Sequence, residues 1–303
     1  MNSQSNAVPE SRSDAQAIAS TAKSTTRPLY WSIRRELWEN RSIYIAPLAV
    51  AGLTLFGFLI ATIGRGLATH DLAQRQAVLE EPYTFATGVI MATAFIVGIF
   101  YSLDALHGER RDRSILFWKS LPVSDVTTVL AKASIPIVIL PLLTFVIIFA
   151  TEWMMMLLSS VALLGSGLSA TTLWGQVMRS QMMLLYHLLT VHVLWHAPIY
   201  AWMLLVSAWA RRMTFLWAAL PPLVIGVLEK IAFNTKHFAA MMGYRLSGPE
   251  AMDFTGPSSS RIHPMTHFEL GKFLIAPGLW GGLIVAAIFL AGAIQLRRYR
   301  EPI

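Results

Sequence analysis

Residues 104–125 read DALHGERRDRSILFWKSLPVSD and separate two long apolar runs, over 85–103 and 133–158. The first half of this stretch is densely charged, whereas the second half is apolar and aromatic as far as Pro122. Proline cannot continue a helix, so a helix that begins in the second half is expected to end there. The pattern predicts a charged loop with a short helix, held between two segments that cross a membrane.

A helix over 114–121 would place Ile115, Trp118 and Leu121 on one side, because they lie three residues apart. One interpretation is a solvated loop whose arginines only fix the membrane topology. Such a loop does not need Phe117 and Trp118 so close to water. We therefore favour a docking element that inserts into a groove on a cytosolic partner, as amphipathic helices do.

The composition of the chain is that of a membrane protein. Of its 303 residues, 55% are hydrophobic and only 14% are charged, whereas soluble domains are about 25% charged. The net charge of +7 does not indicate nucleic-acid binding, because the basic residues cluster at the ends of apolar runs. The chain has no cysteine, which excludes disulfides, thiolate metal sites and cysteine nucleophiles.

Six apolar segments are each long enough to cross the core of a bilayer, which takes about 20 helical residues. The third contains Pro136 and Pro141, which predict a kink of the kind that a helix bundle tolerates. The predicted fold class is an all-α membrane protein with six transmembrane helices. The segments are 43–63, 85–103, 133–158, 182–209, 213–233 and 273–296.

The remaining regions divide into a tail, a leading helix and a long loop. Residues 1–27 are polar and predict a disordered cytosolic tail. Residues 28–41 predict an amphipathic helix in the membrane interface, or alternatively the first turns of the first span. The transmembrane domain would occupy 42–303. Its longest external segment, 234–272, is rich in glycine and proline and has no clear helix signature.

The orientation follows from the basic residues. If the N-terminus is cytosolic, the dense arginine clusters at 110–113 and 297–300 also lie on the cytosolic side, as the positive-inside rule favours. Both termini and the 104–125 stretch are therefore predicted to be cytosolic. Ser124 or Asp125 is suited to cap the start of the third span.

Motifs for nucleotide binding and hydrolysis are absent from the sequence. No G-x-x-x-x-G-K-[ST] occurs, so the chain has no P-loop to cradle phosphates. G-x-S-x-G and H-E-x-x-H are also absent. If the protein works against a gradient, its energy comes from another chain or from an ion gradient.

Two groups of polar residues fall within predicted spans. His192 and His196 are four residues apart, as metal or haem ligands on a helix can be, and His187 lies nearby. We favour the alternative that they face a bundle interior or a dimer seam and bond across helices. Glu152 either faces a cavity or lies at the outer interface. Glu152, His192 and His196 are the candidate residues of a substrate path.

The first loop resembles that of the ABC-2 type transporter permeases. The resemblance rests on L-x-x-E-R-R-D-R-S-I-L-F-W-K-S-L-P-V-S-D, at Leu106 and 109–125, together with Lys132. The resemblance is specific over about 25 residues. In the rest of the chain only the predicted architecture is similar, with six spans, cytosolic termini and a leading helix. The resemblance implies two six-helix permeases side by side, each docked on a nucleotide-binding subunit. The family's coupling helix would correspond to 113–121 and its connecting helix to 28–40.

The resemblance implies the membrane-spanning permease subunit of an ATP-driven ABC exporter in a bacterial inner membrane. Its partners would be a dimeric cytosolic ATPase that carries ATP and Mg, a second permease subunit, identical or homologous, and membrane lipids, but no nucleic acid. This chain would hold no cofactor and would not be an enzyme. The alternative is an intramembrane metal- or haem-binding enzyme that uses His187, His192 and His196. The residues expected to couple to the ATPase are Glu109, Arg110, Arg113, Ile115, Phe117, Trp118, Lys119 and Leu121.

Overall fold

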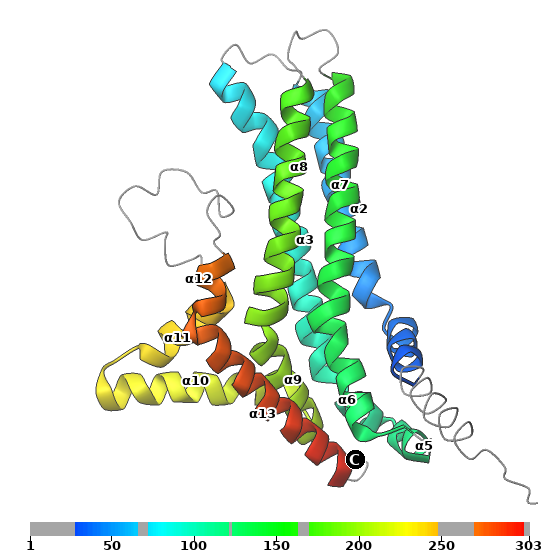
Figure 1. Ribbon diagram of the computed structural model, residues 1–303, viewed down its shortest axis with the longest axis vertical. Helices are drawn as coiled ribbons and strands as arrows, with labels where there is room; N and C mark the ends of the chain where they lie inside the picture. The colour runs from blue at the N-terminus through cyan, green and yellow to red at the C-terminus, as the bar shows by residue number, and fades with distance from the viewer. Residues whose placement is uncertain (1–27, 66–71, 121–122, 163–169, 248–269, 300–303) are drawn as a thin grey trace, which may run out of the picture.

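The computed structural model describes residues 28–65, 72–120, 123–162, 170–247 and 270–299. These residues are helical and contain no β-strand (Figure 1). An N-terminal helix spans 28–39. The other helices are α2 (Ser42–Arg65), α3 (Leu72–Asp104), α4 (His107–Arg111), α5 (Ser114–Ser120), α6 (Asp125–Ser134), α7 (Leu140–Ala162), α8 (Ala170–His187), α9 (Ala197–Trp209), α10 (Thr214–Phe233), α11 (His237–Ser247), α12 (Leu270–Ile275) and α13 (Pro277–Tyr299), with π-helices η1 (Ile135–Ile139) and η2 (Leu188–Trp195).

The described residues contain five continuous helices that are long and apolar enough to cross a membrane. They correspond to the first, second, third, fifth and sixth predicted spans. The fourth predicted span is two helical pieces, 177–195 and 197–209, which meet at a bend of 45° and give a sixth span only if counted together. The chain is therefore a helical protein with the composition of a multi-pass membrane protein.

Prolines account for both π-helical interruptions. Pro136 lies in η1, and the N–H after η1 bonds a carbonyl five residues back. The His196 N–H likewise bonds the Val191 carbonyl at 3.2 Å, and Pro198 lies in the first turn of α9. Proline removes a backbone donor and crowds the preceding turn, so the helix widens or bends there. The bend at His196 was not predicted, although Pro198 marks it.

Four long helices form one part of the molecule. Helices α2, α3, α7 and α8 stand alongside one another in the upper part of Figure 1. Their shared core includes Ile90, Ile148, Leu184 and Leu188. These residues are almost fully buried, as expected where apolar helices pack together in a bundle.

The second part of the molecule is built on α9 and α13, which make the largest contact between two helices in the described residues. Ala201 and Ala286 lie in their shared core, because small side chains let two helix backbones approach closely. In Figure 1, α10 runs across the direction of α7 and α8, and α11 folds back along it.

Three segments were predicted outside the spans: the leading helix, the long external segment and the tail. The N-terminal helix ends before Asn40 and α2 begins at Ser42, so the leading helix is separate from the first span. Helix α11 lies within 234–272, where no helix signature was recognised, and α12 begins at its end. The predicted tail, 1–27, lies outside the described residues.

Candidate functional site: a buried charge cluster behind the first loop

Helix α4 is bound to the end of α9. The backbone N–H groups of Leu106 and His107 both donate to Ser207 Oγ, at 3.0 and 2.9 Å. The Arg110 guanidinium donates to the Ala208 carbonyl at 2.7 Å. A cation at the C-terminal end of a helix satisfies carbonyls that lack an intrahelical partner. The start of the first loop is therefore fixed to α9.

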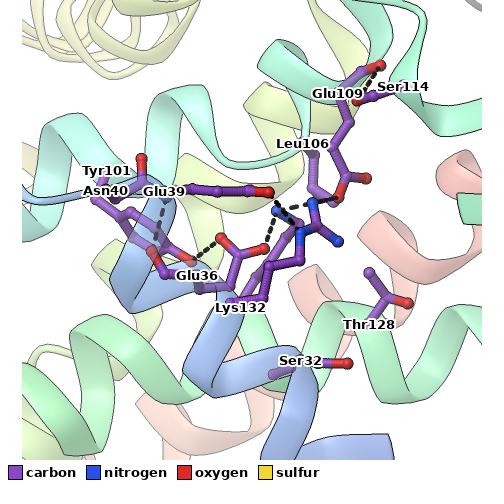
Figure 2. A network of polar contacts seen from close by, with 12 residues as sticks. Ser32, Glu36, Glu39, Asn40, Tyr101, Leu106, Glu109, Ser114, Thr128 and Lys132 are labelled. Carbon is purple, nitrogen blue, oxygen red and sulfur yellow. Dashed lines mark hydrogen bonds and ion pairs between the residues drawn. The ribbon is translucent and has the colours of Figure 1, made fainter.

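Five charged side chains converge next to α4, and we call them the charge cluster. Lys132 Nζ lies 2.7 Å from Glu36 Oε1 and 3.2 Å from Glu109 Oε1. Arg297 reaches Glu109 Oε2 at 3.0 Å and Asp125 Oδ1 at 2.6 Å. Figure 2 shows Lys132 next to Glu36, and Glu109 reaching in from the first loop. The cluster joins the N-terminal helix, α4, α6 and α13.

Four of the five residues of the charge cluster are almost fully buried, and Asp125 is partly exposed. Glu36, Glu109, Lys132 and Arg297 are each at most 6% exposed. Tyr101 from α3 donates its hydroxyl to Glu36 Oε2 at 2.8 Å, which adds a further helix to the network. Buried charges are tolerated when paired, but removal of one partner typically costs about 3–5 kcal/mol. The helices that meet here are therefore difficult to separate.

Arg35 links the cluster to α5. Its guanidinium carbon lies 3.3 Å from the centroid of the Trp118 ring, a cation–π contact. The same side chain lies 2.7 Å from Glu39 Oε1 and 3.5 Å from Glu109 Oε1. Burial tends to lower the pKa of Arg35, but the hydrogen bond to Glu39 and the nearby carboxylates outweigh it and raise that pKa. Arg35 is therefore firmly charged.

Helix α5 buries one face and exposes the other. Ile115 is 2% exposed and Trp118 is half-buried, whereas Leu116 and Phe117 are 59% and 60% exposed. The side predicted to carry Ile115 and Trp118 thus faces the protein. The adjacent pair Leu116 and Phe117 presents apolar surface outward.

The other predicted coupling residues occupy three kinds of position. Glu109 and Arg110 are buried and hold α4 in place. Arg113 is exposed with a φ of 57°, a left-handed conformation unusual for arginine, between α4 and α5. Lys119 is exposed and reaches the Arg298 carbonyl at 3.4 Å. Leu121 lies outside the described residues.

Glu152 is buried among the helices of the bundle. It is 4% exposed, and its carboxylate accepts from Thr87 Oγ1 of α3 at 2.6 Å and from Gln181 Nε2 of α8 at 2.5 Å. These bonds tie α7 to both neighbours. A buried ionisable residue in an apolar helix is a candidate for a functional role.

The histidines surround a separate small pocket at the break in the fourth span. His187, His192 and His196 line a cavity of about 230 Å³ together with Phe95. The His196 ring nitrogens lie 3.1 Å from the Val191 carbonyl and 3.2 Å from the Leu246 carbonyl. Among the described residues, no three His, Cys, Asp or Glu side chains are placed to hold a metal ion. These contacts favour the interpretation of His196 as a polar group bonded within the bundle.

Helix α11 is attached to this break. Arg245 donates to the carbonyls of Trp195 at 3.3 Å and of Gly278 at 2.7 Å, and it stacks on the Trp195 ring. Burial lowers the pKa of Arg245. A Cβ at Gly282 would collide with this guanidinium, so a larger residue there would require the Arg245 side chain to shift.

Sequence reasoning identified the loop but not the charge cluster. Glu36, Asp125, Lys132 and Arg297 are close in space and far apart in the chain, so no local spacing reveals them as a group. Comparisons of the chain with protein-family models, curated proteins and solved structures find no match. Function must therefore be inferred from the residues and their contacts.

Proposed function

We propose that this chain is the membrane-spanning permease subunit of an ATP-driven transporter of the ABC-2 exporter type, in which α5 is the coupling helix. One observation carries the proposal: α5 exposes Leu116 and Phe117 on one side and is held on the other by Ile115 and by the Arg35–Trp118 contact. An exposed apolar pair on a short helix suits insertion into a partner's groove.

The charge cluster supports a role for this loop in transmitting motion. In the proposed mechanism, ATP binding closes the partner ATPase dimer and shifts the groove that holds Leu116 and Phe117. Because Glu109 is paired with Lys132 of α6 and Arg297 of α13, those helices move with the loop. Breaking either buried pair would leave an unpaired charge, so rigid movement costs less free energy than separation.

Other subunits would supply the parts of the transporter that this chain lacks. ATP and Mg belong to the ATPase, and a second permease subunit, identical or homologous, completes the path. Both termini and α5 lie in the cytoplasm, and the membrane is the bacterial inner membrane. Glu152, His192 and His196 are the residues we place along the substrate path.

Copurification from native membranes tests the proposal. Tagged wild-type protein in mild detergent should bring down a P-loop ATPase in stoichiometric amount. Leu116→Ala with Phe117→Ala should lower its yield about 30-fold, the loss of about 2 kcal/mol expected for an anchor residue. Val126→Ala with Leu130→Ala, which removes exposed apolar surface of α6, is the control and should keep the ATPase. A wild-type protein that carries no ATPase would overturn the proposal.

A further inference from the structure

Helices α10 and α11 enclose a groove that the proposed coupling role does not use. The two helices fold back on one another and project from the side of the molecule (Figure 1). The groove between them has a volume of about 740 Å³, within the usual range for ligand sites. Its walls include Leu223, Gly226 and Val227 of α10, and Phe238 and Met242 of α11.

The groove also has a basic side. Lys230, near the end of α10, and Lys236, just before α11, both line it and are exposed. Lys230 bonds only a neutral group among the described residues, Asn234 Oδ1 at 2.6 Å, and Lys236 has no ion pair with any of them. An apolar groove with two ammonium groups is complementary to an amphipathic anion.

Among the described residues, the nearby carboxylate of Glu229 forms no ion pair with either lysine. Both Glu229 oxygens are directed at the start of α11, where they accept from the backbone N–H groups of His237 and Phe238 at 2.8 Å each. Thr235 Oγ1 donates to the same carboxylate at 2.7 Å. Glu229 therefore serves as a cap for α11 and leaves both lysines available to a ligand.

We propose that the groove between α10 and α11 binds an anionic phospholipid, whose acyl chain lies along Gly226, Phe238 and Met242 and whose phosphate lies between Lys230 and Lys236. Apolar contact with the chain and attraction of the phosphate by lysine both favour this occupant. The lysine stems lie along apolar surface while their ammonium groups reach the headgroup level, as long basic side chains do in membranes.

A second copy of the chain fits this groove less well. In a two-fold symmetric contact the same patch faces itself, so Lys230 and Lys236 of two copies would be brought together. Like charges across an interface repel, whereas a lipid phosphate attracts both lysines. In addition, only 6% of the α10 span is buried, so this apolar helix requires a large covering of lipid or protein.

An occupied groove would also support the break in the fourth span. The Tyr244 carbonyl of α11 accepts from Trp195 Nε1 at 3.3 Å, and the Leu246 carbonyl is 3.2 Å from His196 Nε2. Because one side of α11 forms the groove and the other contacts Trp195 and His196, a ligand that holds α11 also holds that bend. Anionic lipid should therefore raise the melting temperature of the purified protein.

Native mass spectrometry with phosphatidylglycerol and phosphatidylcholine tests this site without any ATPase. Wild type should prefer phosphatidylglycerol about 25-fold, since each lysine contributes about fivefold at an anionic headgroup. Lys230→Gln with Lys236→Gln should lose that preference yet still bind phosphatidylcholine. Arg211→Gln with Arg212→Gln, an exposed pair outside the groove, is the matched control and should behave as wild type.

Two variants that fill the groove complete the test. Gly226→Leu on one wall and Ala239→Leu on the other should each reduce retention of both lipids, and two variants guard against a folding defect in one. The proposal is overturned if the double lysine variant keeps the wild-type headgroup preference, or if both filled variants retain lipid normally. A lysine variant that changes the oligomeric mass but not lipid retention would instead identify the groove as a contact between subunits.

Discussion

The Lys132 ammonium lies 2.7 Å from the Glu36 carboxylate, although the two residues are 96 positions apart in the chain. Both side chains are almost completely buried, so this ion pair fixes the N-terminal helix to α6. Glu109 joins the same ammonium at 3.2 Å and brings the first loop to the same point.

Replacing Lys132 by methionine should strongly destabilise the protein. The substitution keeps the length of the side chain but leaves Glu36 buried without a cation, at a cost of about 3–5 kcal/mol. Glu109 loses one cation and keeps its pair with Arg297. Thermal unfolding of the purified protein should show a clear loss of stability. Lys119→Met, at an exposed position, is the control and should unfold as wild type does. Equal melting temperatures for both variants would count against the energetic role of the cluster.

Removing one carboxylate together with Lys132 should restore part of that loss. Glu36→Gln combined with Lys132→Met removes the carboxylate that Lys132→Met leaves unpaired, so the double variant should be more stable than Lys132→Met alone. The comparison uses the same unfolding measurement. If the double variant loses as much stability as the two single variants together, Glu36 and Lys132 are not energetically coupled.

Trp118 and Phe117 should have separable roles although they are adjacent. Trp118 contacts Arg35 within the protein, whereas Phe117 is 60% exposed. In the isolated chain, Trp118→Ala should therefore speed amide hydrogen exchange across α5, and Phe117→Ala should leave exchange near wild type. Similar exchange rates in the two variants would contradict this division of roles.

Glu152→Gln should preserve assembly but lower the ATPase rate of the assembled complex. Glutamine has the same shape and can keep a bond to Thr87, yet it cannot carry the charge of Glu152. Glu152→Ala loses both bonds and should also unfold more easily, by about 1–3 kcal/mol for each buried partner left unsatisfied. A glutamine variant with full activity would remove Glu152 from the proposed path.

His196 should help to hold α11 against the break in the fourth span. Its two ring nitrogens face the carbonyls of Val191 and Leu246, so His196→Ala should increase hydrogen exchange in α11. Elemental analysis of the purified wild-type protein should find no stoichiometric transition metal. A stoichiometric metal that is lost in His192→Ala would favour the alternative of an intramembrane metal enzyme.

Local pattern was enough to predict the long helices and the short helix of the first loop. Apolar runs identify the spans, and Ser124 Oγ accepts from the Thr127 N–H at 3.1 Å as the predicted cap of α6. The helix predicted over 114–121 is α5, Ser114–Ser120. These features depend on residues a few positions apart, which a single sequence displays directly.

The features that were missed depend on distant residues. Which side of α5 faces the protein is decided by Arg35, which lies on another helix and contacts Trp118. The charge cluster joins Glu36 to Lys132 and Glu109 to Arg297, and no periodicity connects those positions. Helix α11 is held by tertiary bonds to Trp195 and Gly278, which override the glycine-rich character of its segment.

Photo-crosslinking from position 117 in native membranes would show which molecule α5 contacts. A photoreactive amino acid replaces Phe117, and a second probe at Val126 of α6 serves as the control. We expect a crosslink from position 117 to a P-loop ATPase and none from position 126. Crosslinks from position 117 to lipid or to this chain alone would contradict the assignment of α5 as the coupling helix.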